Sequence, residues 1–266
     1  MATRDVTQWE TSICKVVSND DEEEIIVRGH KLSELIGSIT FADVMFLMLQ
    51  SRLPSDAERN VLDALLVASV EHGIAPPSMI ARCYASYGTS IQAAVAAGVG
   101  AFGDRMGGLG EQLGCTLVRH VDAAGGPAAV ANDDDKLRAI ARDIVTEATN
   151  NRERVPGYGI PLHGADPRAP GVLRVAREQG IYGVFCQLGM LVEEALGTAR
   201  GGRPVPMNLD GVGAVVILDL GFDWRSTRLF LLTPRSVSMG AHFLEEQAQD
   251  TTWRHIRAEQ IDYSDP

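Results

Sequence analysis

The spacing of apolar residues in the second half of the chain is the feature that most constrains its fold. Behind an acidic run at 133–135, five apolar residues fall at offsets of 0, 3, 4, 7 and 8: Leu137, Ile140, Ala141, Ile144 and Val145. These offsets place the side chains on one face of an α-helix, whereas a half-buried strand would need alternation by two. The segment is therefore predicted to be an amphipathic helix with an acidic N-cap.

The same periodicity predicts further helices along most of the chain. Helical segments are expected over 32–39, interrupted at 38–40, over 41–50, from the N-cap Ser55 to about Glu71, and over 172–192 as one long helix or a kinked pair. Strand signals are confined to 215–217 and 229–232, and both also fit buried helices. Asp20–Val27 is interpreted as an exposed acidic lead-in. The pattern predicts an all-α fold in one domain over residues 1–266.

Composition excludes several classes of function. The formal net charge of −11 opposes binding to nucleic acid, but it leaves room for a small anion held by a few arginines. No apolar stretch approaches the roughly 20 residues of a membrane span, so a cytoplasmic protein is expected. The four cysteines have no metal-ligand spacing and are predicted to be buried free thiols. No metal site is expected.

Two segments in the first half have compositions that suit function. His72, in a Glu-His-Gly sequence before Pro76–Pro77, could donate to an anion or cap the last carbonyls of a helix. Gly103–Glu111 reads GDRMGGLGE, and its glycines allow close approach of backbone amides to a ligand, or equally a tight helix crossing. It lacks the GK[ST] ending of a phosphate-binding loop.

Two further segments lie in the second half. Val155–Arg168 is a long Gly- and Pro-rich loop with aromatic, histidine, aspartate and arginine side chains, which favours a functional loop. Asp210 stands between apolar runs, where partial desolvation would raise the pKa of its carboxyl and make it a base near neutral pH. Asp210 could also be the N-cap of the helix that follows, and the two roles are compatible.

In their order along the chain, these segments resemble the citrate synthase superfamily, particularly its short members similar to citryl-CoA lyase. Val155–Arg168 is similar to the family's VPGFGHPLHKxDPRA, and Met207–Leu220 is similar to NVDGxxAxxLxDLG. The likeness covers nearly the whole chain, and the other matching segments are Val27–Leu32 (IRGYDL), Arg52–Pro54 (GRLP), Glu71–Gly73 (DHG), Gly103–Glu111 (GDxHGGAGEQ) and Arg235–Glu246 (RxxGxxAHxxEE). Each fragment alone is weak evidence for this family, but the ordered set of fragments is strong evidence for it.

The resemblance implies a helical fold with a large core and a smaller lobe, working as a homodimer whose active sites are completed across subunits. It implies chemistry at a carbon–carbon bond next to a CoA thioester, through an enolate. Asp210 matches the acid/base, Arg168 and Arg235 match carboxylate-binding arginines, and His72 matches a substrate-side histidine. The wall against which CoA lies is matched by Val155, Gly157, Tyr158, Gly159 and Asn208. No bound cofactor is implied, and CoA enters as part of the substrate.

The sequence departs from the family at two catalytic positions. Met106 stands where the family has the histidine that stabilises the enolate, and Ile160 stands in place of its second catalytic histidine. Neither side chain donates a hydrogen bond, and loss of one oxyanion donor costs about 3–4 kcal/mol of transition-state stabilisation. His163 and Arg105 are the nearest replacements. The family also has a histidine at the position of His163, so that residue need not be a relocated catalyst.

Two hypotheses follow from this departure. In the first, the chain is a divergent lyase acting on a CoA thioester or an anionic β-oxo or β-hydroxy acid, with Asp210 and His163 as catalytic residues. His72, Arg105, Met106, Ile160, Arg168 and Arg235 would then line the substrate site. In the second, the chain is an inactive acyl-CoA-binding homologue or partner subunit. Retention of Asp210, Arg168 and Arg235 favours the lyase. His242 is interpreted as structural, on a packed helix.

Overall fold

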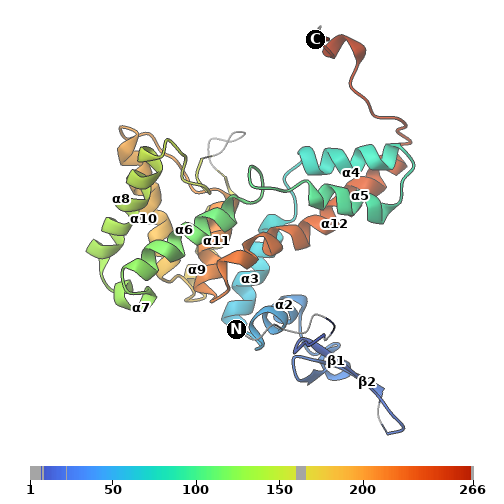
Figure 1. Cartoon of the computed structure of the whole chain (residues 1–266), viewed down its shortest axis with the longest axis horizontal. Helices are drawn as coiled ribbons and strands as arrows, with labels where there is room; N and C mark the ends of the chain where they lie inside the picture. Colours follow the sequence, from blue (N-terminus) through green and yellow to red (C-terminus); the bar gives the residue numbers. More distant parts are fainter. Residues whose placement is uncertain (1–6, 8, 22, 160–165, 265–266) are drawn as a thin grey trace. The chain divides into compact units, whose positions relative to one another are not determined.

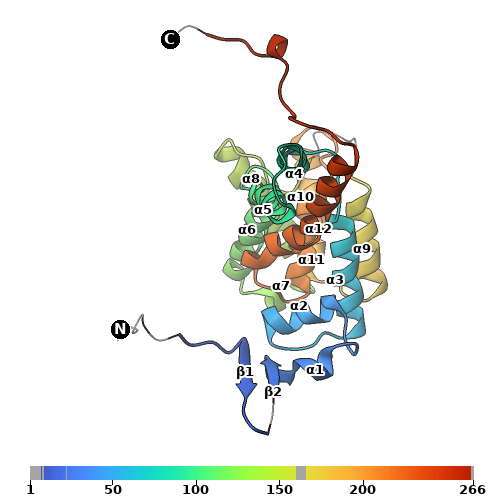
Figure 2. The same cartoon turned by 90° about the vertical axis from the view of Figure 1, so that its right-hand side faces the viewer.

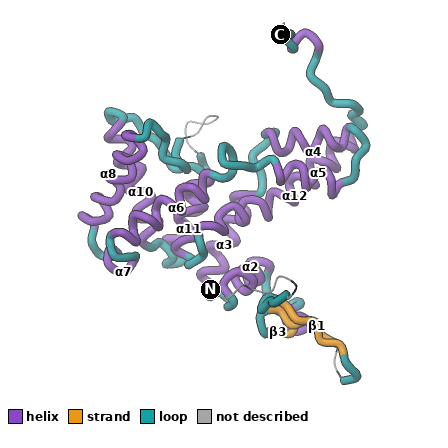
Figure 3. The backbone as a smooth tube through the Cα atoms, in the orientation of Figure 1, coloured by secondary structure: helices purple, strands orange, loops and turns teal. Residues whose placement is uncertain are grey.

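The computed structural model describes residues 7, 9–21, 23–159 and 166–264. It divides into two compact units, Met1–Asn60 and Val61–Pro266. Helices and loops dominate, and strands occur only near the start of the described chain (Figure 3). This confirms the all-α prediction. The prediction of one domain over the whole chain stays a prediction.

The first unit contains a small antiparallel sheet and the first helices. Its elements are β1 (Cys14–Ser18), β2 (Glu23–Val27), β3 (His30–Lys31), α1 (Leu32–Leu35) and α2 (Phe41–Gln50). β1 and β2 lie side by side with Cys14 paired to Val27 and Ser18 to Glu23 (Figure 2). Thr40 and Asp43 form a reciprocal capping box that begins α2, because each side chain bonds the other residue's backbone N–H, at 3.3 and 2.7 Å.

The second unit contains the remaining helices, which Figure 1 labels along the chain. They are α3 (Asp56–Ser69, begun in the first unit), α4 (Pro76–Ser86), α5 (Ile91–Gly100), α6 (Leu109–Ala123), α7 (Pro127–Val130), α8 (Asp134–Asn150), α9 (Arg168–Glu178), α10 (Val184–Ala199), α11 (Leu209–Asp219), η1 (Trp224–Ser226), α12 (Thr227–Ala248) and η2 (Ala258–Gln260). None of the helices in the described ranges is long and apolar enough to cross a membrane.

Helix α11 is the centre of the larger core. It packs against α6, α9 and α10, and α10 packs in turn on α8. Buried side chains cover all sides of α11, including Val212, Val215, Val216 and Ile217, each with no exposed surface. A helix that is apolar all round needs neighbours on every face, so α11 can only be stable inside such a bundle.

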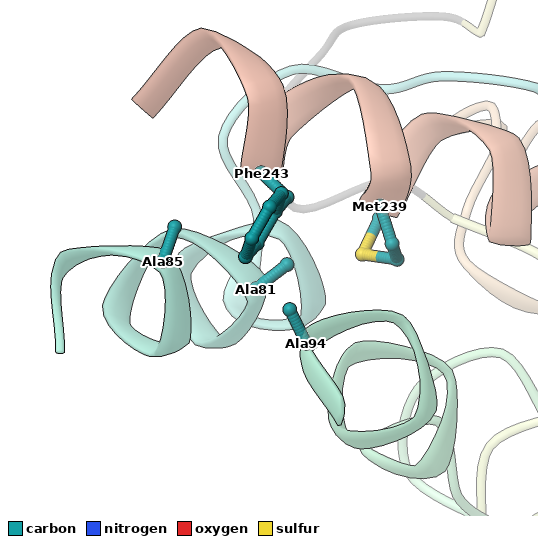
Figure 4. Close-up of a cluster of buried hydrophobic side chains, with 5 residues drawn as sticks. All are labelled: Ala81, Ala85, Ala94, Met239 and Phe243. Carbon is teal, nitrogen blue, oxygen red and sulfur yellow. The ribbon is translucent and has the colours of Figure 1, made fainter. Parts of the chain in front are cut away.

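Helix α12 connects this core to a smaller lobe. It contacts α6 and α11 and also α4 and α5 (Figure 1). Between α4, α5 and the later turns of α12, Met239 and Phe243 pack on the small side chains of Ala81, Ala85 and Ala94 (Figure 4). The three alanines allow the helices to approach closely, so the lobe has a hydrophobic cluster of its own.

Helix boundaries agree with several predictions. The segment 41–50 is α2 itself, and Ser55 caps α3, because Ser55 Oγ accepts from the Glu58 backbone N–H at 3.3 Å while Glu58 bonds the Ser55 N–H at 2.7 Å. Asp133 caps α8 by accepting from the Lys136 backbone N–H at 3.0 Å. The segment 172–192 forms two helices, α9 and α10, and both strand-like segments are helical, in α11 and α12.

Three predictions about local structure are wrong. The acidic lead-in contains strand β2, because Glu23–Val27 finds paired partners in β1 and β3. The helix expected over 32–39 stops at Leu35. All four cysteines are free, but only Cys186 is buried, and Cys14 is exposed on the edge strand of the small sheet.

Candidate active site

Asp210 lies in the first turn of α11, next to the residue that caps this helix. The N-cap is Asn208, whose side-chain oxygen accepts from the Gly211 backbone N–H at 3.2 Å. The alternative that Asp210 is itself the N-cap is therefore wrong. Because Asn208 meets the capping requirement, the carboxyl of Asp210 is available for another role.

The surroundings of Asp210 change its acidity. Burial raises the pKa of Asp210 from 3.8 to about 6, and the neighbouring Asp166 acts in the same direction. The positive charges of Arg168, Arg235 and Arg228 oppose this shift without cancelling it. A carboxyl with this pKa is largely ionised at neutral pH, and it is more basic than an ordinary aspartate, so it can take and return a proton efficiently.

A small pocket, open to solvent, borders Asp210. Its wall is formed mainly by apolar side chains of α3, α11 and α12 and by the glycine-rich turn: Leu65, Ser69, Gly107, Leu209, Asp210, Gly213, Thr227, Phe230 and Leu231. Asp210 is the one ionisable group in this wall. A proton on a ligand in the pocket would thus meet a single carboxyl base in apolar surroundings.

Arg168 is held beside Asp210 by a bidentate pair with Asp166. Its Nε and Nη2 donate to the two carboxylate oxygens at 2.8 and 2.7 Å. Burial alone would raise the pKa of Asp166, but the hydrogen bonds from Arg168 and from the Leu209 backbone N–H lower it overall. The Leu209 contact places this ion pair at the start of α11. Arg168 Nη1 is buried and has no hydrogen-bond partner in the described ranges.

Arg235, on α12, is the second arginine near Asp210. Its side chain is buried, with Nη1 3.7 Å from Glu71 Oε1, and its Nε has no hydrogen-bond partner in the described part of the chain. Burial lowers the pKa of Arg235, and the nearby positive charge of Arg168 acts in the same direction. Two buried guanidinium groups with unfilled donors therefore converge on one carboxyl.

Glu71 connects His72 to α12. Its Oε1 accepts from the His72 backbone N–H at 2.7 Å, while Oε2 accepts from Ser238 Oγ and lies 3.2 Å from His242 Nε2. His242 Nδ1 in turn accepts from Arg82 Nε at 3.0 Å, which fits its interpretation as a structural residue. His72 is thereby fixed next to the segment of α12 that carries Arg235.

The glycine-rich turn is a tight reversal stabilised by two backbone hydrogen bonds between Gly103 and Met106, at 2.9 and 3.0 Å. Arg105 is exposed at its tip, and Met106 is partly buried. Gly107 has φ +77°, and a Cβ there would collide with the Phe102 ring, so glycine is required. Nothing in this geometry directs Arg105 to Asp210.

The predicted CoA wall forms a continuous surface of backbone. The Gly159 N–H donates to Pro206 O at 2.8 Å, the Asn208 N–H donates to Gly157 O at 3.0 Å, and Asn208 Nδ2 donates to Gly159 O at 2.9 Å. Val155 is buried, and the Tyr158 hydroxyl donates to Gly189 O at 2.7 Å. Asn208 and Tyr158 therefore have clear structural roles. Ile160 and His163 lie outside the described residues.

The structure thus gathers Asp210, Arg168 and Arg235 around one centre, with the Gly107 backbone in the adjoining pocket wall. Sequence reasoning missed Asp166, Glu71 and Arg228 as members of this cluster. A local signal exists for Asp166, which precedes Arg168 by two residues, and for Glu71, which precedes His72. Arg228 has none. No group of three or more His, Cys, Asp or Glu side chains among the described residues is arranged to hold a metal ion.

Comparisons with known proteins agree with this architecture. Residues 55–258 match the family model for the citrate synthase C-terminal domain. A protein of Mycobacterium tuberculosis named "Putative citrate synthase 2" is 26% identical over 199 residues, which are 73% of this chain. The chain spans 49% of that relative's length.

Solved structures show the same fold. Citryl-CoA lyase from Hydrogenobacter thermophilus superposes with a TM-score of 0.83 and 30% identity, covering 97% of this chain and 95% of that one. ATP citrate lyase of Methanosaeta concilii in complex with (3S)-citryl-CoA gives a TM-score of 0.77 at 19% identity, covering 99% of this chain and 43% of that one, which is a likeness of fold. The family match extends over most of the chain, so the protein belongs to the citrate synthase family.

Proposed function

We propose that the protein is a carbon–carbon lyase of the citryl-CoA lyase type, acting through an enolate on a CoA thioester or an anionic β-oxo or β-hydroxy acid. The observation that carries the proposal is the pKa of Asp210, raised by burial to about 6, in a carboxyl that faces a mainly apolar pocket. Such a carboxyl suits proton transfer at a carbon next to a carbonyl group.

The two arginines support an anionic substrate. Arg168 Nη1 and Arg235 Nε are buried donors with no partner among the described residues. A buried donor without a partner costs about 1–3 kcal/mol, and a ligand carboxylate would remove that cost. Since guanidinium groups bind carboxylates in planar pairs, a substrate with at least one carboxylate near the reacting carbon fits this site.

Coenzyme A is proposed as part of the substrate, with no resident cofactor. Support comes from the citryl-CoA lyase and the citryl-CoA complex found among the structural neighbours. In this chain, the hydrogen-bonded loop 155–159 and Asn208 form the surface proposed to face the CoA moiety. Because the Gly157 and Gly159 oxygens already accept hydrogen bonds, shape and apolar contact would contribute most of the CoA affinity there.

A homodimer with active sites completed across the subunits is also proposed. The smaller lobe exposes large apolar side chains on α4, at its C-cap and on α12: Met79 is 52%, Tyr87 54%, Val237 69% and Leu244 57% exposed. Apolar side chains grouped on packed helices are typical of a subunit interface. Light scattering coupled to gel filtration measures the mass of the protein in solution and so tests for a dimer. Mixing Asp210→Asn subunits with Arg235→Gln subunits tests for shared sites, because activity returns only if one site takes residues from both subunits.

The second hypothesis, an inactive acyl-CoA-binding homologue, is favoured by Met106, whose side chain cannot donate a hydrogen bond. The two hypotheses differ in one measurement, the exchange of α-protons for deuterium in a panel of acyl-CoA thioesters and free β-oxo acids in heavy water. The lyase hypothesis expects exchange with at least one compound, lost in Asp210→Asn and retained in Asp63→Asn. Asp63 is the matched control because it is exposed on α3, which also lines the pocket.

The pH dependence adds a second requirement. Exchange should increase with pH through an apparent pKa near 6, because Asp210 must be ionised to accept the proton. Exchange that persists in Asp210→Asn contradicts the assignment of the base. Binding of thioesters without any exchange favours the inactive homologue.

A further inference from the structure

Arg228 is a cation at the active site that neither the sequence motifs nor the proposed chemistry uses. It is the second residue of α12, directly after Thr227, which lines the pocket. Its Nη2 bonds Asp104 Oδ1, and its Nε lies 2.8 Å from Glu111 Oε2. Asp104 is in the glycine-rich turn and Glu111 is in the first turn of α6. Arg228 is therefore fixed to the turn that forms one side of the pocket.

The guanidinium group of Arg228 lies directly against the backbone of this turn. A Cβ built on Gly108 would stand 2.8 Å from Arg228 Cζ, from Arg228 Nη2 and from Gly103 O, so an added methyl group would meet both the guanidinium group and the turn. The neighbouring Gly107 lines the same pocket as Asp210. Close to it, the start of α6 touches the start of α11, because a Cβ on Gly110 would stand 2.7 Å from Asp210 O.

Two carboxylates border Arg228, the exposed Asp104 and the partly buried Glu111, which is 28% exposed. Asp104, which binds Nη2, is 77% exposed in its side chain, so solvent screens much of its charge, whereas Arg228 is 27% exposed. The effect reaches the base, since Arg228 is one of the groups that lower the pKa of Asp210 against burial. The other charged groups acting on Asp210 are Arg168, Arg235 and Asp166.

We propose that Arg228 is a further catalytic residue, whose guanidinium donates a hydrogen bond to the substrate oxygen that becomes negative during proton removal. This inference rests on the proposed function. The Cα–H bond breaks, the proton passes to the Asp210 carboxylate, the electron pair forms the Cα=C bond, and the carbonyl oxygen gains the charge. Arg228 Nη2 bonds Asp104, whereas Nε lies 2.8 Å from Glu111 Oε2 but is buried without a hydrogen-bond partner in the described residues. Nε or Nη1 is the donor proposed for the substrate oxygen. The side chain of Met106, in the same turn, cannot supply it.

The test measures α-proton exchange in heavy water for Arg228→Gln, Arg228→Lys and Gly108→Ala, with acetyl-CoA and longer acyl-CoA thioesters as probes. Removal of an oxyanion donor lowers the rate about 10²- to 10³-fold, which is the expected loss for Arg228→Gln. Arg228→Lys keeps the charge and should recover part of that loss.

Gly108→Ala keeps the arginine but displaces it, so the exchange rate of this variant should also fall. Arg225→Gln is the matched control, because Arg225 is 73% exposed and pairs only with Asp223 in the described structure.

A second readout separates a catalytic role from a structural one. Loss of the Arg228 charge should move the apparent pKa of the exchange reaction upward, because Arg228 lowers the pKa of Asp210. A residue that only holds the turn would change melting temperature and total activity without moving that pKa. Exchange in Arg228→Gln at the wild-type rate and with the wild-type pH profile overturns this inference and leaves the proposed function intact. Absence of exchange in the wild-type protein overturns both.

Discussion

Gly157 and Gly211 touch through their backbones. A Cβ on Gly157 would stand 2.8 Å from the Cα of Gly211, and a Cβ on Gly211 would overlap with the carbonyl oxygen of Gly157. Gly211 directly follows Asp210, so this contact fixes the start of α11 against the loop proposed to face CoA. This backbone contact thereby joins the proposed base to the loop proposed to face CoA.

This contact predicts that alanine is poorly tolerated at either glycine. Gly211→Ala and Gly157→Ala are each expected to destabilise the protein by about 1–3 kcal/mol, because the added methyl group forces backbone apart. Gly157→Ala has the further cost of its φ of +82°. Chemical denaturation measures the change in unfolding free energy. Gly171→Ala is the control, since nothing lies within 4 Å of its added Cβ in α9. That control should be neutral or stabilising by up to about 1 kcal/mol, as alanine is favoured in helices.

The raised pKa of Asp210 predicts that the protein loses stability as the pH rises. This pKa is raised from 3.8 in the unfolded chain to about 6, so the folded state binds more protons between these values and loses stability as pH rises through them. Above pH 6 the cost is about 3 kcal/mol. Asp210→Asn removes it, so this variant should be more stable than the wild type at pH 7–8 by up to that amount.

The same linkage gives the control for this prediction. Below about pH 4 both proteins carry a neutral group at position 210, and the difference in unfolding free energy should disappear. Asp63→Asn is the control variant for the effect of removing a carboxylate, because Asp63 is exposed on α3. Equal stability of Asp210→Asn and the wild type at pH 8 would contradict a desolvated carboxylate at this position.

Much of the fold could be predicted from sequence because the signals are local. The range of α2 follows from Thr40 and Asp43, whose capping box lies within four residues, and α8 follows from its apolar stripe and Asp133. The hairpin β1–β2 could not be predicted from sequence in this way. Glu23 and Glu24 are poor strand formers, and their strand conformation depends on pairing with another strand. The mostly exposed side chains of the hairpin give no clean alternation.

The site was predicted unevenly for the same reason. Asp210, Arg168 and Arg235 carry the family motifs, and the structure brings them together. Arg228 belongs to no motif, and its partner Asp104 lies 124 residues away along the chain. Only the packing of α12 against α6 and the glycine-rich turn brings the two together, so no local pattern could have indicated the pair.

The unfilled donors on Arg168 and Arg235 predict binding of small carboxylates. Citrate at 100 times its dissociation constant should raise the unfolding free energy by about 2.7 kcal/mol, which appears as a higher melting temperature. Arg235→Lys should weaken this effect at least 10-fold in apparent affinity, because a lysine cannot reproduce the planar donor pair. Arg138→Gln is the control, since Arg138 pairs with Glu194 on the surface. An equal citrate response in Arg235→Lys and the wild type would contradict the proposed anion site.

The stability of the smaller lobe is expected to depend on a buried ion-pair network around Glu246. Glu246 has no exposed surface, and its Oε2 lies 2.7 Å from Arg82 Nη1 and 2.9 Å from Arg254 Nη2. Arg82 also pairs with Glu245, which is 56% exposed, so Glu246→Gln removes the buried one of its two counter-charges and a loss of up to about 3–5 kcal/mol is expected. Glu259→Gln, which removes an exposed pair with Arg257, should change stability by less than about 0.5 kcal/mol.

Measuring the unfolding free energy at acid pH tests whether the charge of Glu246 causes this loss of stability. The hydrogen bonds from Arg254 and Arg82 outweigh burial and lower the pKa of Glu246, so its contribution to stability is present above pH 4.5 and is lost as pH falls through the lowered value. The difference in unfolding free energy between the wild type and Glu246→Gln should therefore shrink below pH 4.5. A difference that stays constant from neutral to acid pH would mean that Glu246 acts through packing, because Glu246 contributes to the charge balance of Arg82 and Arg254 only in its ionised form.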